Sequence, residues 1–335
     1  MLLAATVPIP VFAALTPILH LPASTLTYNV LFALSTAHGG LSGLFWIDAR
    51  YRRYLGTNRR RFYGTAAWIA CVGLIGTLLL GQDFLSWFVA FYLAWTAVHF
   101  SRQNWGVICL AASSLGGSRP SQLENLACHV ASAGGGIGVI AGIAPALGLH
   151  GPGLRMFAVV GLSLVIAAFA CSVVVAMRLI GERAPLLRVG ITLSIGVFFV
   201  PIYLFGPVIG FTCVGLTHAI QYALIMFLLA GDNRQGSRFL RVGGTLLSAA
   251  LYILTFYALQ DHAFWGSWSG VATVVLYSVV MWHFLLDSEL FRLRNAVPRN
   301  IVKESLPFLF PKVAPQMVPP DSRHSRSATS ALSQA

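Results

Sequence analysis

The chain has 335 residues, of which 57% are hydrophobic and only 10% are charged. Soluble domains carry about 25% charged residues, so this composition excludes an ordinary soluble protein and indicates an integral membrane protein. The formal net charge of +12 is typical of membrane proteins whose cytoplasmic loops collect Lys and Arg, and we expect no nucleic-acid partner.

Residues 1–22 are apolar but contain Pro8, Pro10 and Pro17, and no Lys or Arg precedes them. A cleavable signal peptide needs a basic segment at its start, so we expect a broken span or a re-entrant segment instead. The first expected span covers residues 25–48, and six arginines follow it between Arg50 and Arg61. This cluster is expected to be cytoplasmic.

Further apolar stretches have about 20 residues each, which is the length that crosses a bilayer. They cover residues 63–81, 84–103, 125–149, 154–178, 187–206, 208–230, 239–259 and 268–291. With the first span they make nine, or ten if the N-terminal segment crosses, and they predict an all-α polytopic transmembrane bundle over residues 23–295. Alternate loops are rich in arginine, whereas the opposite loops contain only Arg155. This asymmetry predicts a bacterial inner-membrane protein with a cytoplasmic C-terminus.

Beyond residue 295 the sequence becomes rich in proline and serine. Such a composition is unable to bury a hydrophobic core. We therefore expect residues 296–335 to form a flexible cytoplasmic tail, in contact with anionic membrane lipids.

A glycine-rich stretch, Ala133-Gly134-Gly135-Gly136-Ile137-Gly138, lies inside one expected span. Inside a membrane, small residues permit close helix packing. We therefore predict a packing role for these glycines, and no phosphate-binding loop.

Four expected spans that run in the same direction each carry a histidine part way along. These are His38, His99, His218 and His283. They lie roughly 10 to 15 residues from the estimated starts of their spans, which at 1.5 Å per residue is ~15 to 22 Å deep. A single membrane histidine is more often a core residue bonded to a neighbouring helix, so it is the agreement in depth that favours one shared site.

Three of the histidine helices carry one or two further polar groups about one turn after the histidine, on the same face. These groups are Gln103, Gln221, Tyr222 and Asp287. A carboxylate inside a membrane needs a partner, and Asp287 follows His283 by four residues, so the two are expected to lie together. His129, near the start of the return span, is expected to be a fifth histidine of the site.

Imidazole and carboxylate ligands without thiolate select iron, zinc, manganese or copper. We therefore predict a transition-metal site, with iron as the first choice, whose ligands are His38, His99, His218, His283, Asp287 and His129. Gln103, Gln221 and Tyr222 would support the site by hydrogen bonds and take part in catalysis.

A metal site inside lipid suits a metal-dependent oxidoreductase or oxygenase that acts on a hydrophobic substrate, such as a lipid, a fatty acyl chain or a terpenoid. Its partners would be this substrate, membrane lipids and an electron donor. Two alternatives stay open at this point. One is a proton-coupled permease that uses the same histidines and aspartate without metal, and the other is a haem protein with two of the histidines as axial ligands.

The pair His38-Gly39 resembles the His-Gly pair of the membrane carotene-cleaving dioxygenases of the Brp/Blh type, and His218 and His283 are loosely similar to further histidines of that family. The acidic residue that follows the pair in the family is replaced here by Gly40-Leu41-Ser42. The resemblance implies a many-span helical protein whose histidines hold iron. Motifs of uncharacterised His-rich bacterial membrane proteins are similar to His99-x-x-x-Gln103 with Trp105-Gly106, and to Trp282-His283 with Asp287 and Arg292.

Overall fold

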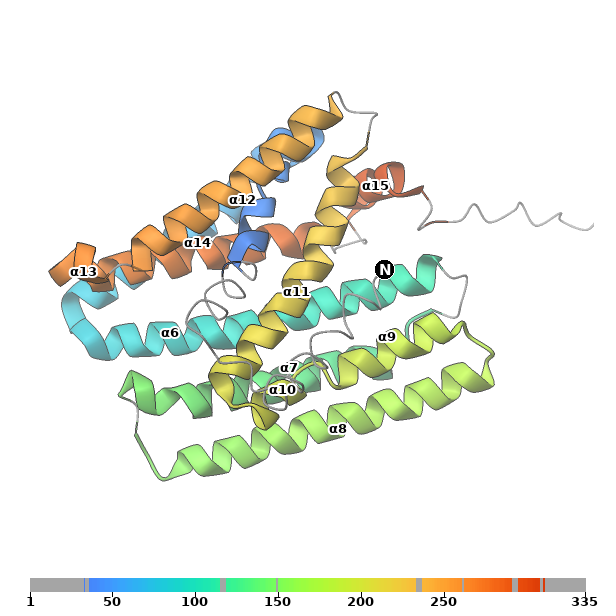
Figure 1. The fold of residues 1–335 in the computed structure, drawn as a ribbon, viewed down its shortest axis with the longest axis horizontal. Coiled ribbons are helices and arrows are strands. Elements are labelled where there is room, and N and C mark those ends of the chain that lie inside the picture. The colour runs from blue at the N-terminus through green and yellow to red at the C-terminus, as the bar shows by residue number, and fades with distance from the viewer. Residues whose placement is uncertain are drawn as a thin grey trace, which may run out of the picture.

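The computed structural model describes residue 33 and residues 36–114, 119–148, 150–232, 237–260, 262–290, 295–307 and 310. These residues form helices and turns without any strand, which confirms the all-α architecture (Figure 1). Six helices are long and apolar enough to cross a membrane, so the expected count of nine or ten spans is not confirmed. The N-terminal segment 1–22 and most of the first expected span lie outside the described residues.

Large apolar side chains cover the outside of the bundle. Leu79 is 76% exposed and Phe239 is 82% exposed, and both lie on helices of membrane-spanning length. In water such a surface would associate or aggregate, whereas in a bilayer it is the natural contact with lipid tails. The outer surface therefore agrees with the composition in indicating an integral membrane protein.

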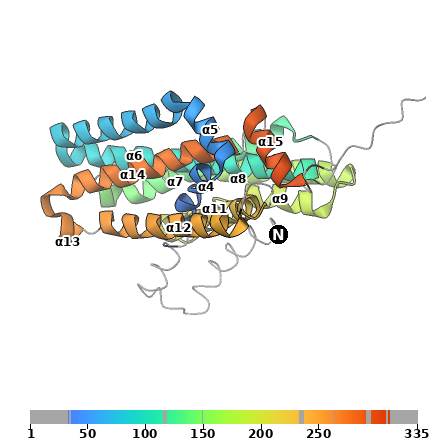
Figure 2. The same ribbon diagram turned by 90° about the horizontal axis from the view of Figure 1, so that it is seen from above.

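Helix α6, Thr65–Ser114, is a hairpin rather than one continuous rod. Its 50 residues would extend ~75 Å at 1.5 Å per residue, more than twice the thickness of a bilayer core. The chain reverses at Gly81, whose φ of 68° is readily adopted only by glycine. Gly76 then lies directly against the ring of Phe84, and the two arms run side by side (Figure 2). These arms correspond to the expected spans 63–81 and 84–103.

The next layer contains α7, Gln122–Ile143, with a 3₁₀ turn at Ala144–Leu147, and α8, Gly153–Gly181. The glycine-rich stretch of α7 packs closely on its neighbours, as expected: a Cβ on Gly134 would lie 2.6 Å from the carbonyl oxygen of Gly161. A Cβ on Gly135 would lie 2.1 Å from the ring of Phe199. Only glycine permits this approach, so these residues shape the helix interface.

The expected span 187–206 is broken into α9, Leu186–Gly196, and α10, Val200–Leu204. Pro201 explains the break, because proline has no backbone N–H and its ring clashes with the carbonyl four residues earlier in a continuous helix. Tyr203 of α10 donates a hydrogen bond of 2.6 Å to the Gly134 carbonyl. The break thus locks α10 onto α7.

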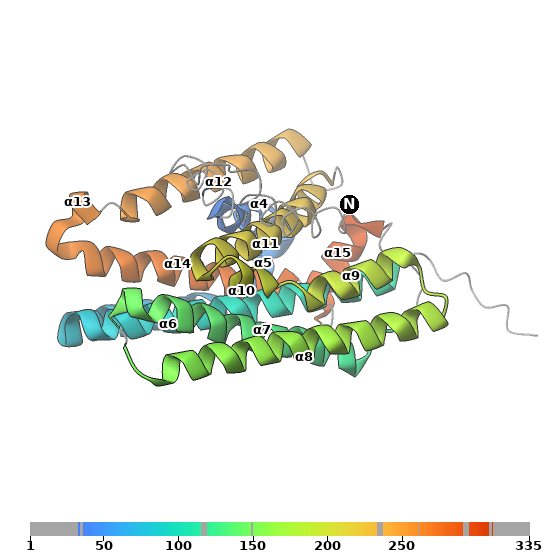
Figure 3. The same cartoon turned by 60° about the horizontal axis from the view of Figure 1, so that its bottom comes forward.

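The remaining long helices are α11, Pro207–Ala230, α12, Arg238–Gln260, and α14, Ser269–Leu290. Between α12 and α14 lie α13, His262–Trp265, and a 3₁₀ turn at Gly266–Trp268. Helix α11 crosses the others obliquely (Figures 1 and 3). This crossing brings the middle of α11 to the histidine-bearing parts of α6 and α14.

The chain before α6 forms α4, Leu44–Ile47, α5, Ala49–Thr57, and a π-helical turn at Arg60–Gly64. Asp48 caps α5 and lies 2.9 Å from Arg50 and 3.1 Å from Arg241 of α12. Glu289 of α14 accepts a hydrogen bond of 2.6 Å from Tyr54, and burial together with this carboxylate raises the pKa of Tyr54 to about 12. These contacts join α5 to α12 and α14.

Helix α15, Ala296–Ser305, follows α14 and lies inside the part of the chain expected to be a flexible tail. Ile301 and Val302 are buried in one apolar cluster with Tyr51 and Leu55 of α5. For residues 296–305 the expectation of a loose tail is therefore wrong, because an apolar face at helical spacing packs on α5. Residues 311–335 lie outside the described residues.

Candidate metal centre

Four helical segments bring the predicted histidines together. One ligand atom each from His38, His218, His283 and Asp287 lies within 4.8 Å of the others. His99 Nε2 lies 3.1 Å from His218 Nε2 and 3.5 Å from Asp287 Oδ2. His99, His218, His283 and Asp287 are buried, and His38 is 9% exposed. The expectation that the histidine layer forms one centre is confirmed in its geometry.

His283 and Asp287 share one face of α14, and His283 Nε2 lies 3.0 Å from Asp287 Oδ2. Neither of these two atoms makes a hydrogen bond, although both are buried. Metal–ligand bonds of 2.0–2.2 Å place neighbouring ligand atoms about 3.0 to 3.5 Å apart in octahedral or tetrahedral geometry. The separations around Asp287 Oδ2 fall in this range.

Ser42 bridges His283 and Asp287. Its hydroxyl donates to Asp287 Oδ1 at 3.1 Å, and its Oγ lies 2.7 Å from His283 Nδ1. When the single hydroxyl proton goes to Asp287, the Nδ1–H of a neutral His283 is the donor to Ser42. In this tautomer His283 Nε2 presents a lone pair toward the carboxylate oxygen, an arrangement of two acceptors that a shared cation stabilises.

Charge balance also favours a cation at this position. Asp287 is completely buried, and its ion-pair contacts among the described residues are with His99 and His283 only. A buried carboxylate without a permanent cation is costly. A bound divalent ion would compensate this charge while using the imidazoles as neutral ligands.

The ring planes of the histidines are held by aromatic packing. His99 stacks on Phe284 at a centroid distance of 4.2 Å, and His38 lies edge-on to His218 and His283 at 4.7 and 4.8 Å. Imidazole is a ligand only when its nitrogen points at the metal, so this packing preorients the site.

Three predicted supporting residues adjoin the cluster. Gln103 Nε2 donates to the His218 carbonyl at 3.1 Å and to Gln221 Oε1 at 3.3 Å. Tyr222 is completely buried, and its hydroxyl lies 2.8 Å from Ser42 Oγ. The glutamines therefore join α6 to α11, while the Tyr222 ring lies edge-on to His38 and His283 at 5.9 and 5.6 Å.

Ser42 was not among the predicted site residues, although it contacts Tyr222, His283 and Asp287. The four-residue spacing from a histidine would have identified it. Ser42 follows His38 by four residues, as Gln103 follows His99 and Asp287 follows His283.

His129 does not belong to the centre. It is exposed on α7, where its Nδ1 lies 2.8 Å from the carbonyl oxygen of Asn125, and no histidine of the cluster contacts it. Leu126 and Ala133, three residues before it and four residues after it, are exposed as well, so His129 lies on an exposed face of this part of α7. Its prediction as a ligand is wrong.

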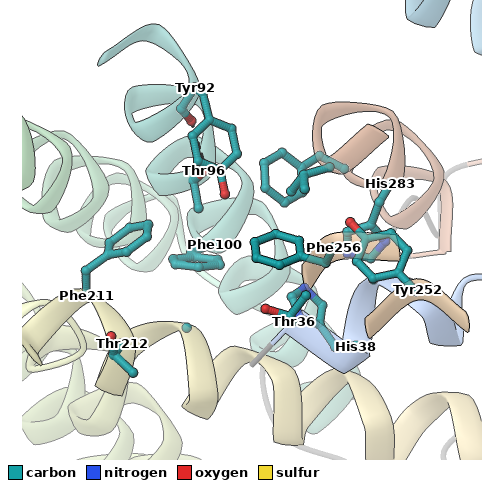
Figure 4. Close-up of a pocket in the computed structure, with 14 residues that line it drawn as sticks. Thr36, His38, Tyr92, Thr96, Phe100, Phe211, Thr212, Tyr252, Phe256 and His283 are labelled. Carbon is teal, nitrogen blue, oxygen red and sulfur yellow. Dashed lines mark hydrogen bonds between the residues drawn. The ribbon is translucent and has the colours of Figure 1, made fainter. Parts of the chain in front are cut away.

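A cavity of about 80 Å³ adjoins the cluster (Figure 4). In the figure His38, His283 and Tyr252 lie at one side of it, and Phe211 and Thr212 lie at the other. The other lining residues are Thr36, Gly39, Tyr92, Thr96, Phe100, Gly215, Phe256, Val280 and Phe284. The walls are thus aromatic and apolar with a few hydroxyls, and the two histidines are their only ionisable nitrogens.

Comparisons of this chain with protein-family models, with curated proteins and with solved structures find no match. The site residues form a His/Asp cluster that could bind a metal ion within a helical bundle of membrane type.

Proposed function

We propose that this chain is an integral membrane, metal-dependent oxidoreductase or oxygenase acting on a hydrophobic substrate. The observation that carries the proposal is the pair of facing acceptor atoms, His283 Nε2 and Asp287 Oδ2, 3.0 Å apart without a hydrogen bond. A metal ion between the two atoms would satisfy both of them at once.

The donor set favours a transition metal, and iron first. Up to four imidazoles and one carboxylate are available, without a thiolate among the ligands that the structure brings together. Magnesium and calcium prefer oxygen ligands, whereas imidazole suits iron, zinc and copper. Bound iron would supply activation of dioxygen and one-electron chemistry.

The adjoining cavity supports a hydrophobic substrate. Its volume of about 80 Å³ is below the 150 Å³ of an engineered apolar cavity that accepts benzene. This space suits dioxygen or the end of a linear chain better than a ring system. Its aromatic walls keep water from the ligand side on which His38 and His283 are found.

Oxidation in this setting also requires electrons. Hydroxylation or desaturation with dioxygen takes two electrons from the substrate and two from a donor, so we include an electron donor among the partners. The arginine-rich side of the protein would face the cytoplasm of a bacterial cell, where reduced donors are available.

Metal analysis of the detergent-purified protein tests the proposal. We expect stoichiometric transition metal in the wild type, loss of most of it in His283→Ala, and a smaller loss in Asp287→Asn. His129→Ala is the matched control, because this histidine lies outside the cluster, and it should retain the metal. Lipid extracts of cells with and without the protein should then differ by an oxygenated, desaturated or cleaved product that depends on dioxygen.

A proton-coupled permease is the second candidate, because the polar atoms also form a chain. His283, Asp287, His99 and His218 follow one another at 3.0, 3.5 and 3.1 Å, which suits proton relay. Wild-type protein without metal in both aerobic and reducing preparations, with His283→Ala abolishing proton-dependent uptake, would replace the first proposal by the second. A Soret band in the optical spectrum would instead indicate haem.

A further inference from the structure

Four exposed arginines lie close together in the chain, just before the first membrane-spanning helix. This cluster, called the arginine face below, consists of Arg52, Arg53, Arg59 and Arg60. Arg52 and Arg53 lie on α5, and Arg59 and Arg60 follow the turn at Asn58 with which α5 ends. The opposite side of the same segment carries Tyr51, Leu55 and Phe62, which are buried in the apolar cluster shared with α11 and α14. The packing therefore fixes the direction in which the arginine face points.

The charges of the arginine face are uncompensated, unlike those of the arginines around it. Arg50 and Arg241 pair with Asp48, and Arg61 pairs with Glu289. By contrast, none of the four makes an ion pair with a described acidic residue. Arg52 and Arg53 donate only to the carbonyls of Trp46 and Ala49, at 3.2 and 3.3 Å.

The position of the face along the membrane normal follows from the helix that begins there. The candidate span Arg60–Ser114 starts within the arginine face. Trp46 and Tyr63 lie beside it and contact each other through Trp46 Nε1 and the Tyr63 hydroxyl at 3.3 Å. Tryptophan and tyrosine collect at the headgroup level of membranes, so the arginine face lies where lipid phosphates are found.

We propose that the arginine face binds the headgroups of anionic phospholipids in the adjacent leaflet. Guanidinium groups form bidentate hydrogen bonds with phosphate oxygens, and a basic cluster next to a span attracts acidic lipid. Lipid bound here holds α5 against the cluster that contains Tyr222 and Leu286, and so stabilises the folded bundle. The proposal does not depend on the metal chemistry.

The test uses full-length protein in a neutral detergent, with phosphatidylglycerol or zwitterionic phosphatidylcholine added to the micelles. Thermal unfolding and native mass spectrometry report stabilisation and retained lipid. In the wild type we expect phosphatidylglycerol to raise the unfolding temperature by several degrees more than phosphatidylcholine. The apparent affinity of the protein for phosphatidylglycerol should fall roughly fivefold for each arginine removed.

Two variants and a charge-matched control decide the outcome. Arg52→Gln/Arg53→Gln/Arg59→Gln/Arg60→Gln should lose the preference for phosphatidylglycerol. Arg59→Gln/Arg60→Gln removes no hydrogen bond among the described residues and should fold normally. It should lose about half of the difference in unfolding temperature between the two lipids. The control replaces four exposed arginines elsewhere by glutamine, namely Arg119, Arg155, Arg178 and Arg183, and should keep the preference.

The proposal is overturned if the wild type responds equally to both lipids, or if the control loses the preference as fully as the double variant does. It is also overturned if the arginine face binds an acidic protein while phosphatidylglycerol has no specific effect.

Discussion

Ser42→Ala tests the reasoning about the metal centre most directly, because this hydroxyl contacts three site residues without being a ligand. Its Oγ lies 2.8 Å from the Tyr222 hydroxyl, 2.7 Å from His283 Nδ1 and 3.1 Å from Asp287 Oδ1. Without it, His283 is free to place its proton on Nε2, the nitrogen that would bind metal. Losses of this kind weaken metal binding by roughly 10- to 100-fold, or about 1.4 to 2.7 kcal/mol.

Chelator competition on the purified protein measures this change as a metal Kd. Ser132→Ala is the matched control, because Ser132 is also buried and also loses a hydrogen bond, to the Ala97 carbonyl at 2.6 Å, but lies away from the ligands. The control should retain the wild-type Kd. A Ser42→Ala protein that folds and binds metal as tightly as the control would refute the assignment of the His283 proton.

Two further predictions concern the fold. Gly135→Ala should lower the unfolding temperature, because its new methyl group would meet the Phe199 ring at 2.1 Å and overpacking typically costs about 1 to 3 kcal/mol; Gly243→Ala, with open space around it, is the control for thermal unfolding. Reporter fusions at Asn58 and Asp261 should show cytoplasmic and external locations respectively, as the arginine asymmetry predicts, and equal activity at both sites would contradict that topology.

The helices were predictable from apolar runs where each run forms one straight element. The expected span 208–230 matches α11, Pro207–Ala230, and 239–259 matches α12, Arg238–Gln260. Hydropathy does not register an interruption whose residues are themselves apolar. The break before α10 therefore escaped it, because Val197, Phe198 and Phe199 turn the chain while remaining as apolar as a helix. Pro201 was the residue in the sequence that indicated this break.

The site was predictable to the extent that depth along a helix determines position, and no further. Depth identified the shared layer, and the four-residue spacing identified Asp287. The direction in which a side chain points around its helix depends on which face packs, and on α7 Leu126, His129 and Ala133 share an exposed face. His129 was therefore assigned to the wrong side. Ser42 was missed because a serine in an apolar stretch carries little signal until its neighbours in space are known.

A repeated spacing around the histidines relates the ligands to the residues that support them and to the residues that line the cavity. On the segments that carry His38, His99, His218 and His283, the residue four positions later is Ser42, Gln103, Tyr222 or Asp287. Three positions before the last three histidines lie Thr96, Gly215 and Val280, and all three line the cavity.

The polar supports thus follow the histidines by about one turn, and the residues that line the cavity precede three of them by about one turn. Small or apolar residues before each histidine leave room, whereas the residues after it supply hydrogen bonds. In the proposed function, a substrate in the cavity would approach the layer from the side of Thr96, Gly215 and Val280. The Ser42 hydroxyl, 2.8 Å from the Tyr222 hydroxyl, belongs to the supports, and Tyr222 packs in the apolar cluster that also contains Tyr51 and Leu55 of α5.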